Sequence, residues 1–172
     1  MLGIVFRLDP DLSLHRVKTS VRIPNGTSWT TSSDFIYLTD SPTKNIVKYP
    51  YDASTGAIDF AAGTTFFTLE GTPYAHGVPD GHCQDTEGHF WIACYGTGKV
   101  VRVNPEGKVV AEISLPTRCV TCPAFCGTKL YITSAAEEAP EEHPWSAEYG
   151  GAVFEVEVGV QGRPLNKFKL AK

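Results

Sequence analysis

An internal repeat limits the folds open to this chain of 172 residues more than any other property of its sequence. Four segments share one pattern, a strand with alternating apolar residues followed by a turn and a return strand: residues 5–13, 46–56, 100–108 and 153–162. Their equivalent positions Ile46, Val100 and Val153 lie about 50 residues apart, in the range of four-stranded propeller blades. A solenoid of parallel strands would need a shorter period, so antiparallel strands in radial blades fit best.

A second pattern lies between these segments, in residues 23–40, 78–95 and 115–135. Each copy begins with an apolar residue, a proline and a polar residue, and continues through a short strand and a turn into a second strand. The polar residue should open the innermost strand of its blade, near Asn25, Asp80 and Thr117. Because innermost strands line the central channel of a propeller, the sequence predicts that Asn25 and Asp80 point toward one axis.

The composition fits a soluble all-β protein. Short runs rich in Val, Ile, Phe, Tyr and Trp alternate with turns supplied by 16 glycines and 12 prolines. Basic residues are scattered in a chain of net charge −4, which argues against nucleic-acid binding. The only mild basic cluster is Arg163, Lys167, Lys169 and Lys172. No apolar run approaches the ~20 residues of a membrane span, and the start does not resemble a signal peptide. The odd number of cysteines, five, indicates reduced thiols in a cytoplasmic protein.

The polar residues around these patterns have two interpretations. Asn25-Gly26 and Asp80-Gly81 could simply be favoured turn dipeptides. A zinc site is also conceivable in and just before the second copy, where five potential ligands lie: His76, His82, His89, Asp85 and Glu87. The simpler expectation is that the histidines are polar residues on a half-exposed sheet, and that Asp85 and Glu87 fix the turn closed by Gly88.

The run CVTCPAFC at residues 119–126 resembles a metal-binding knuckle. A fourth ligand is missing unless Cys83 or Cys94 is recruited, so we expect small buried residues on a blade strand instead. Four aromatic residues are expected in the core between blades: Trp29, Phe35, Phe90 and Trp91. The acidic segment 137–151 is expected to be a solvated loop.

Several motifs together resemble the family of senescence marker protein (regucalcin), gluconolactonase and luciferin-regenerating enzyme. They are Pro-Asn-Gly at 24–26, Tyr-Asp-x-x-Thr-Gly at 51–56 and Pro-Asp-Gly-x-x-x-Asp-x-Glu-Gly-x-x-Trp at 79–91. The match covers nearly the whole chain in the correct order. The resemblance implies a six-bladed β-propeller, of which residues 1–172 form a single partial propeller domain of about three blades, similar to a carboxy-terminal half.

The resemblance also implies divalent-metal-dependent hydrolysis of a sugar-type lactone. Asn25 matches an asparagine that coordinates the metal. Asp80 matches an aspartate that coordinates the metal and serves as proton acceptor or donor. The cation would be Ca²⁺ or Zn²⁺, with Mg²⁺ or Mn²⁺ as further candidates. The family's glutamate ligand and its substrate-binding residues lie in blades without a counterpart in this sequence, so no substrate-binding residue is assigned.

Two alternatives to a lactone hydrolase stay open from the sequence. One is a non-catalytic partial propeller that acts as a binding scaffold or is an inactive copy, and the other is a metal-buffering protein without turnover. A partial ring would also leave blade edges open, which favours self-association.

Overall fold

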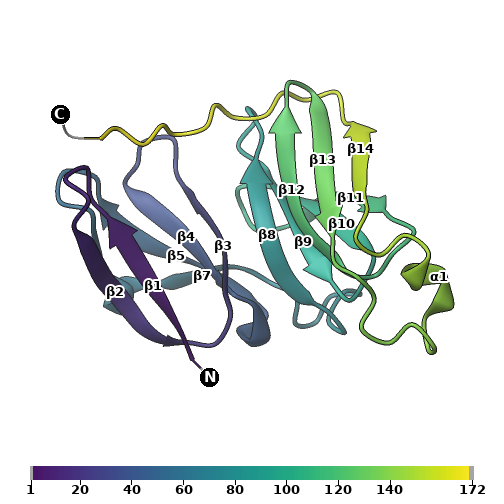
Figure 1. The fold of residues 1–172 in the computed structure, drawn as a ribbon. Coiled ribbons are helices and arrows are strands. Elements are labelled where there is room, and N and C mark those ends of the chain that lie inside the picture. The colour runs from purple at the N-terminus through teal and green to yellow at the C-terminus, as the bar shows by residue number, and fades with distance from the viewer. Residues whose placement is uncertain (1, 171–172) are drawn as a thin grey trace.

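The computed structural model describes residues 2–170 and confirms the all-β fold (Figure 1). Its strands are β1 Gly3–Leu8, β2 Leu14–Val21, β3 Pro24–Trp29, β4 Phe35–Asp40, β5 Asn45–Asp52, β6 Ala57–Ile58, β7 Thr64–Thr68, β8 Val78–Gln84, β9 Phe90–Tyr95, β10 Lys99–Val103, β11 Val109–Ser114, β12 Val120–Cys126, β13 Lys129–Ser134 and β14 Val153–Glu157. The helical elements are α1 Pro144–Ala147 and the 3-10 turns Ser41–Thr43 and Phe60–Ala62. Within the described residues, no helix is long and apolar enough to cross a membrane.

The antiparallel strands form three blades and a two-stranded ribbon. Blade A has the order β3-β4-β5, with β7 beside β5 and the short β6 extending it. Blade B has the order β8-β9-β10-β11, and blade C has the order β12-β13-β14. The ribbon consists of β1 and β2. This arrangement confirms a partial propeller of about three blades, in which the innermost strand β8 packs against both β3 and β12.

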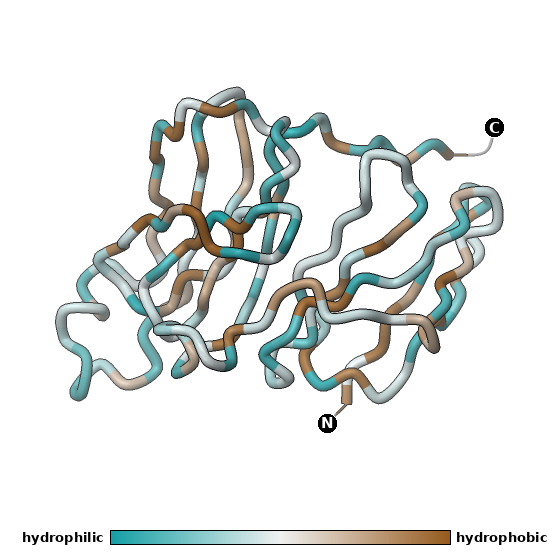
Figure 2. The backbone as a smooth tube through the Cα atoms, turned by 180° about the vertical axis from the view of Figure 1, so that it is seen from behind, coloured by the Kyte–Doolittle hydropathy of each residue, from teal (hydrophilic) through white to brown (hydrophobic). Residues whose placement is uncertain are grey.

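Two apolar clusters join the blades. Tyr37, Ile46 and Phe67 of blade A meet Phe90 and Ile92 of blade B. The opposite face of β9 packs against blade C through a second cluster: Trp91, Ala93, Val100, Val120, Leu130 and Ile132. Seen from behind, apolar stretches follow the strands and most turns are hydrophilic (Figure 2). The alternating pattern that predicted the strands therefore also places the core between the blades.

The expected aromatic core is confirmed for two of its four residues. Phe90 and Trp91 are buried on opposite faces of β9. Trp29 and Phe35 are only partly buried and lie outside both clusters. The Trp29 ring instead contacts Tyr51 edge-on, with ring centroids 6.1 Å apart.

The end of the chain crosses the far ends of the innermost strands (Figure 1). We call residues 161–170 the strap. Gly162 N donates to Gly127 O at 2.9 Å beside blade C, and Arg163 N donates to Gln84 O at 3.0 Å in blade B. The Arg163 side chain reaches blade A, where Nη2 donates to Thr30 O at 2.9 Å. The strap thus bonds to all three blades.

The two ends of the row of blades, the β1–β2 ribbon and blade C, each have strand surface that no other strand covers. On the ribbon, Ile4, Phe6 and Leu8 point to one side of β1 and are 36%, 52% and 48% exposed. On blade C, β14 pairs with β13 and has no second partner strand among the described residues. Exposed apolar faces and free strand edges both promote association.

The purified 172-residue chain is therefore expected to self-associate. Phe6→Glu should reduce this association, because it places a charge in the exposed apolar row of β1. Val110→Glu is the matched control, since Val110 is 50% exposed on β11, away from that row. Light scattering after size exclusion, over a range of concentrations, measures the effect. A chain that stays a monodisperse monomer at every concentration would contradict the expectation.

Candidate functional site

Each innermost strand contains a β-bulge near its start. The register shifts between Pro24 and Thr27 in β3, between Pro79 and His82 in β8, and between Val120 and Cys122 in β12. A bulge inserts one extra residue and can redirect a side chain out of the regular alternation. The residues within the three bulges are Asn25-Gly26, Asp80-Gly81 and Thr121.

Gly26 and Gly81 lie inside strands β3 and β8, and neither has a positive φ. The interpretation as hairpin turn dipeptides is therefore wrong for both. Their missing side chains instead allow neighbouring blades to approach closely. A Cβ on Gly26 would lie 2.8 Å from Asp80 O, and a Cβ on Gly81 would lie 2.5 Å from Cys122 Sγ.

The close approach brings the side chains of Asn25 and Asp80 together from adjacent blades. Asp80 is half-buried, and this burial raises the pKa of its carboxyl to about 6. Hydrogen bonds from the Asn25 side chain and from Gly81 N–H oppose that rise in pKa. The Asn25 amide is also held from the other side, because Nδ2 donates to Ser41 Oγ at 3.3 Å.

No Lys, Arg or His among residues 2–170 forms an ion pair with Asp80. Withdrawing a carboxylate from water costs free energy unless a partner compensates. A half-buried carboxylate with a raised pKa and no cationic partner is therefore a candidate functional group.

The donor atoms of this pair fit a hard divalent cation, which prefers carboxylate and amide oxygens. In this structure the Asn25 side chain lies near the Asp80 carboxyl, and its Nδ2 donates to Ser41 Oγ. Rotating its amide by 180° would present Oδ1 instead, and Ser41 Oγ could then donate to that oxygen. Among residues 2–170, no group of three His, Cys, Asp or Glu side chains could hold a metal ion. Asn25 and Asp80 would thus supply two ligands of a larger set.

In blade C, the residue at the start of the innermost strand differs from the sequence prediction. β12 begins at Val120, and its bulge contains Thr121 rather than Thr117. Thr117 is fully buried and lies 3.1 Å from the Ser146 hydroxyl, so it anchors the loop before β14. The residue equivalent to Asn25 and Asp80 is therefore Thr121, whose Oγ1 lies 2.7 Å from Thr133 Oγ1.

Segment 137–151 is not solvated throughout, contrary to expectation. The Glu137 side chain is 1% exposed and accepts hydrogen bonds from Arg118 Nε at 2.8 Å and Nη2 at 2.5 Å. This ion pair lowers the pKa of Glu137 to about 2. Ser146 is also buried, whereas Trp145 is exposed. The loop is therefore fixed at two points to the residues that precede β12.

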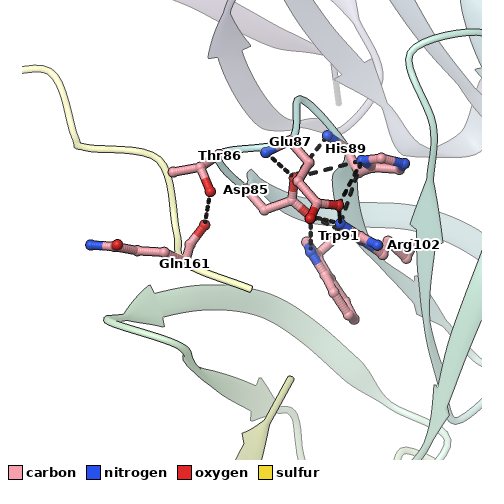
Figure 3. Close-up of polar contacts among 7 residues, drawn as sticks. All are labelled: Asp85, Thr86, Glu87, His89, Trp91, Arg102 and Gln161. Carbon is pink, nitrogen blue, oxygen red and sulfur yellow. Dashed lines mark hydrogen bonds and ion pairs between the residues drawn. The ribbon is translucent and has the colours of Figure 1, made fainter. Parts of the chain in front are cut away.

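Asp85 has a structural role, shown in Figure 3. Its fully buried carboxylate accepts hydrogen bonds from the backbone N–H groups of Glu87 and His89, each at 3.0 Å. It also accepts from Trp91 Nε1 at 3.0 Å and from Arg102 Nε and Nη2 at 2.9 and 2.7 Å. Gly88 closes the turn with a φ of +81°. The expectation that Asp85 fixes this turn is confirmed.

His82 is buried rather than half-exposed. Its Nε2 lies 2.8 Å from Ser28 Oγ, and its ring lies 5.5 Å from that of Phe90. Burial lowers the pKa of His82 to about 4, so the ring is neutral at pH 7. The bulge shifts the alternation of β8 and turns His82 toward blade A, which the sequence pattern alone did not reveal.

The cysteine run is only partly buried. Cys119 is buried, but Cys122 and Cys126 on β12 are exposed, contrary to expectation. All five cysteines are free thiols. Although Cys122 as a whole is exposed, its sulfur lies against Gly81 of β8; burial of the thiol, and to a smaller extent the charge of Asp80, raises the pKa of that thiol.

Antiparallel blades whose innermost strands lie side by side define a partial β-propeller. A family model for the SMP-30/Gluconolactonase/LRE-like region matches residues 1–136, and the chain belongs to this family. Pentonolactonase XacC of Haloferax volcanii is 35% identical over 169 residues, covering 94% of this chain and 56% of the relative.

Two solved structures are similar over nearly the whole chain. A luciferin-regenerating enzyme has a TM-score of 0.84 at 26% identity, over 98% of this chain and 55% of the other. A calcium-binding protein, regucalcin, from Agrobacterium tumefaciens has a TM-score of 0.81 at 28% identity, over 96% of this chain and 55% of the other. The chain spans about half the length of the curated relatives it matches.

Proposed function

We propose that this chain takes part in the divalent-metal-dependent hydrolysis of a sugar-type lactone, with Asn25 and Asp80 as metal ligands and Asp80 also as the acid/base group. The observation that carries the proposal is the meeting of Asn25 with a half-buried, unpaired Asp80 carboxylate at matching bulges of adjacent blades. A relative named pentonolactonase and a structural relative called calcium-binding support the chemistry and the cofactor.

In this proposal Asp80 moves a proton in both halves of the reaction. Its carboxylate would accept a proton from the water that attacks the lactone carbonyl carbon. It would return that proton to the ring oxygen as the carbon–oxygen bond breaks, which leaves a hydroxy acid and restores the carboxylate. When bound, a cation such as Ca²⁺ would polarise the carbonyl and lower the pKa of water. The amide of Asn25 would orient Asp80 and share the cation.

Asn25→Ala is expected to weaken divalent-cation binding at least ~10-fold, since loss of even an indirect partner of a metal typically costs ~10- to 100-fold in affinity. The fold should persist, because the Asn25 side chain is exposed in part and, among residues 2–170, contacts only Ser41 and Asp80 through polar groups, while the bond from Thr27 to its backbone oxygen is kept by alanine. Calorimetric titration with CaCl₂ and with ZnCl₂ measures the affinity. Asn166→Ala, in the strap, is the matched control. Equal affinities for the two variants would contradict the assignment.

Hydrolysis itself is tested by titrating the acid released from a gluconolactone-type substrate, with and without a chelator. Turnover that depends on the metal supports the proposal. Metal binding without turnover would instead favour the alternative of a non-catalytic scaffold or a metal-buffering protein. Because the chain spans about half the length of its relatives, the same assay in a propeller completed with the amino-terminal blades of a relative separates these outcomes.

A further inference from the structure

A cavity lies at the other end of the innermost strands from Asn25 and Asp80. Its volume is about 410 Å³, within the roughly 300–1,000 Å³ of small-molecule sites. Its walls come from the later halves of β3, β8 and β12 and from the strap: Thr27, Ser28, Trp29, His82, Cys83, Gln84, Pro123, Ala124, Phe125, Arg163, Pro164, Leu165 and Asn166. Neither Asn25 nor Asp80 lines it, so it is separate from the site described above.

Most of the cavity wall is apolar, and its largest apolar side chains are Trp29, Phe125 and Leu165. The polar residues of blades A and B are largely bonded to one another. Ser28 Oγ lies 2.8 Å from His82 Nε2 and accepts from Gln84 Nε2 at 2.7 Å. These polar groups therefore already have hydrogen-bond partners, and they lie beside an apolar wall.

Arg163 is the only charged side chain among the lining residues at neutral pH, because His82 is neutral and the wall contains no Asp or Glu. Its Nη1 donates to Gln84 Oε1 at 2.8 Å and to Trp29 O, and its Nη2 donates to Thr30 O. These three bonds leave two of its five N–H groups, including Nε–H, without a partner among residues 2–170. They hold the guanidinium against the cavity.

Another unpaired donor belongs to Trp29, a residue of the same wall. Trp29 Nε1 is buried and has no hydrogen-bond partner within the described part of the chain. Leaving a buried donor without an acceptor costs free energy, but this nitrogen is covered by protein atoms and is not reached from the cavity. The unpaired N–H groups of Arg163, together with its positive charge, which has no acidic partner among residues 2–170, favour an anionic acceptor.

We propose that this cavity binds a small organic monocarboxylate with an apolar body. The carboxylate would accept hydrogen bonds from the free N–H groups of Arg163, since guanidinium and carboxylate match in geometry and charge. The apolar body would lie against Trp29 and Phe125. Neutral ligands of the same shape would lose the ionic contact, and cations would be repelled by Arg163.

The test compares benzoate with its neutral isostere benzamide, by calorimetry on the chain. Benzoate is expected to bind 1:1 with a Kd on the order of 1 mM, as suits so small a ligand, and benzamide about tenfold more weakly. Arg163→Gln should abolish the preference for benzoate, and Arg163→Lys should retain part of it. Lys167→Gln is the matched control, because Lys167 carries the same charge in the strap but does not line the cavity.

Because Arg163 also holds the strap in place, a second variant tests the cavity without altering that network. Ala124→Leu adds volume on the wall formed by β12 and should abolish benzoate binding while thermal unfolding stays unchanged. Equal binding of benzoate and benzamide, binding that survives Ala124→Leu, or no saturable binding of benzoate would each overturn the proposal.

Discussion

Asp85→Ala is expected to lower the free energy of unfolding by roughly 3–5 kcal/mol, the range found when one partner of a buried ion pair is removed. The fully buried carboxylate accepts hydrogen bonds from two backbone N–H groups, the Trp91 indole and the Arg102 guanidinium (Figure 3). Alanine would leave these donors without their acceptor. The loss should fall toward the lower end of the range, because Arg102 Nη2 keeps a second partner, Glu87 Oε2, at 2.7 Å.

Urea unfolding followed by tryptophan fluorescence measures this loss, and Asp59→Ala is the matched control. Asp59 is also an acceptor of backbone N–H groups, from Ala61 and Ala62, but it is exposed and forms no ion pair among residues 2–170. Its loss should cost about 1 kcal/mol, as for other capping residues. Similar losses for the two variants would show that the buried network at Asp85 contributes little.

A second substitution isolates the role of charge in the same network. Arg102→Met, combined with Asp85→Ala, removes the cation that the single variant leaves poorly paired. If the uncompensated charge is the main cost, the double variant should be more stable than Asp85→Ala alone. If the double variant loses as much free energy of unfolding as the two single variants together, the two side chains act independently.

One sequence motif thus contains two aspartates with opposite environments. Asp85 has five N–H donors and an ion pair, so the fold requires it as a carboxylate. Asp80 has no ion pair in the described part of the chain and its pKa is raised, so the fold gains little from its charge. Spacing in the sequence cannot separate these roles, because both residues stand next to turns or bulges within the same few positions.

The sequence predicted the strands and blades because alternation of apolar residues is a local property. The third blade shows where this reasoning failed. Asn25 and Asp80 each follow a proline directly, and the same rule selects Thr117 after Pro116. The bulge of β12 instead lies at Thr121, because residues 117–119 belong to the buried connection that holds Arg118 against Glu137. Only the tertiary contacts of that connection reveal the offset.

The burial of His82 and the exposure of Cys122 could not be predicted for a related reason. A bulge adds one residue and so exchanges the two faces for every later residue of the strand. The sequences of β8 and β12 do not by themselves show where the bulges lie. The bulges become recognisable only from close contacts between blades, those of Gly26 with β8 and of Gly81 with β12. The cavity under the strap depends on still more distant residues, since Arg163 contacts blade A more than 130 positions away.

Asp80→Asn is expected to reduce lactone hydrolysis by ~10²- to 10⁴-fold, the usual contribution of general acid–base catalysis. Asparagine keeps the shape of aspartate and one carbonyl oxygen for a cation, but it cannot accept a proton at neutral pH. The substitution should not destabilise the fold. Burial raises the pKa of Asp80, which means that its ionised form is disfavoured in the folded state, and a neutral side chain relieves that cost at pH 7.

Activity and stability, measured together, separate a functional aspartate from a structural one. Activity is measured as the initial rate of hydrolysis in a propeller completed with the amino-terminal blades of a relative. Stability is measured by thermal unfolding. Asp52→Asn is the matched control, because Asp52 is exposed and organises a turn by accepting hydrogen bonds from Ser54 and Thr55. Asp80→Asn should lose activity at unchanged or higher stability, whereas Asp52→Asn should keep activity and lose some stability. Undiminished turnover in Asp80→Asn would show that Asp80 serves only the geometry of the bulge, and that proton transfer must be assigned to another group.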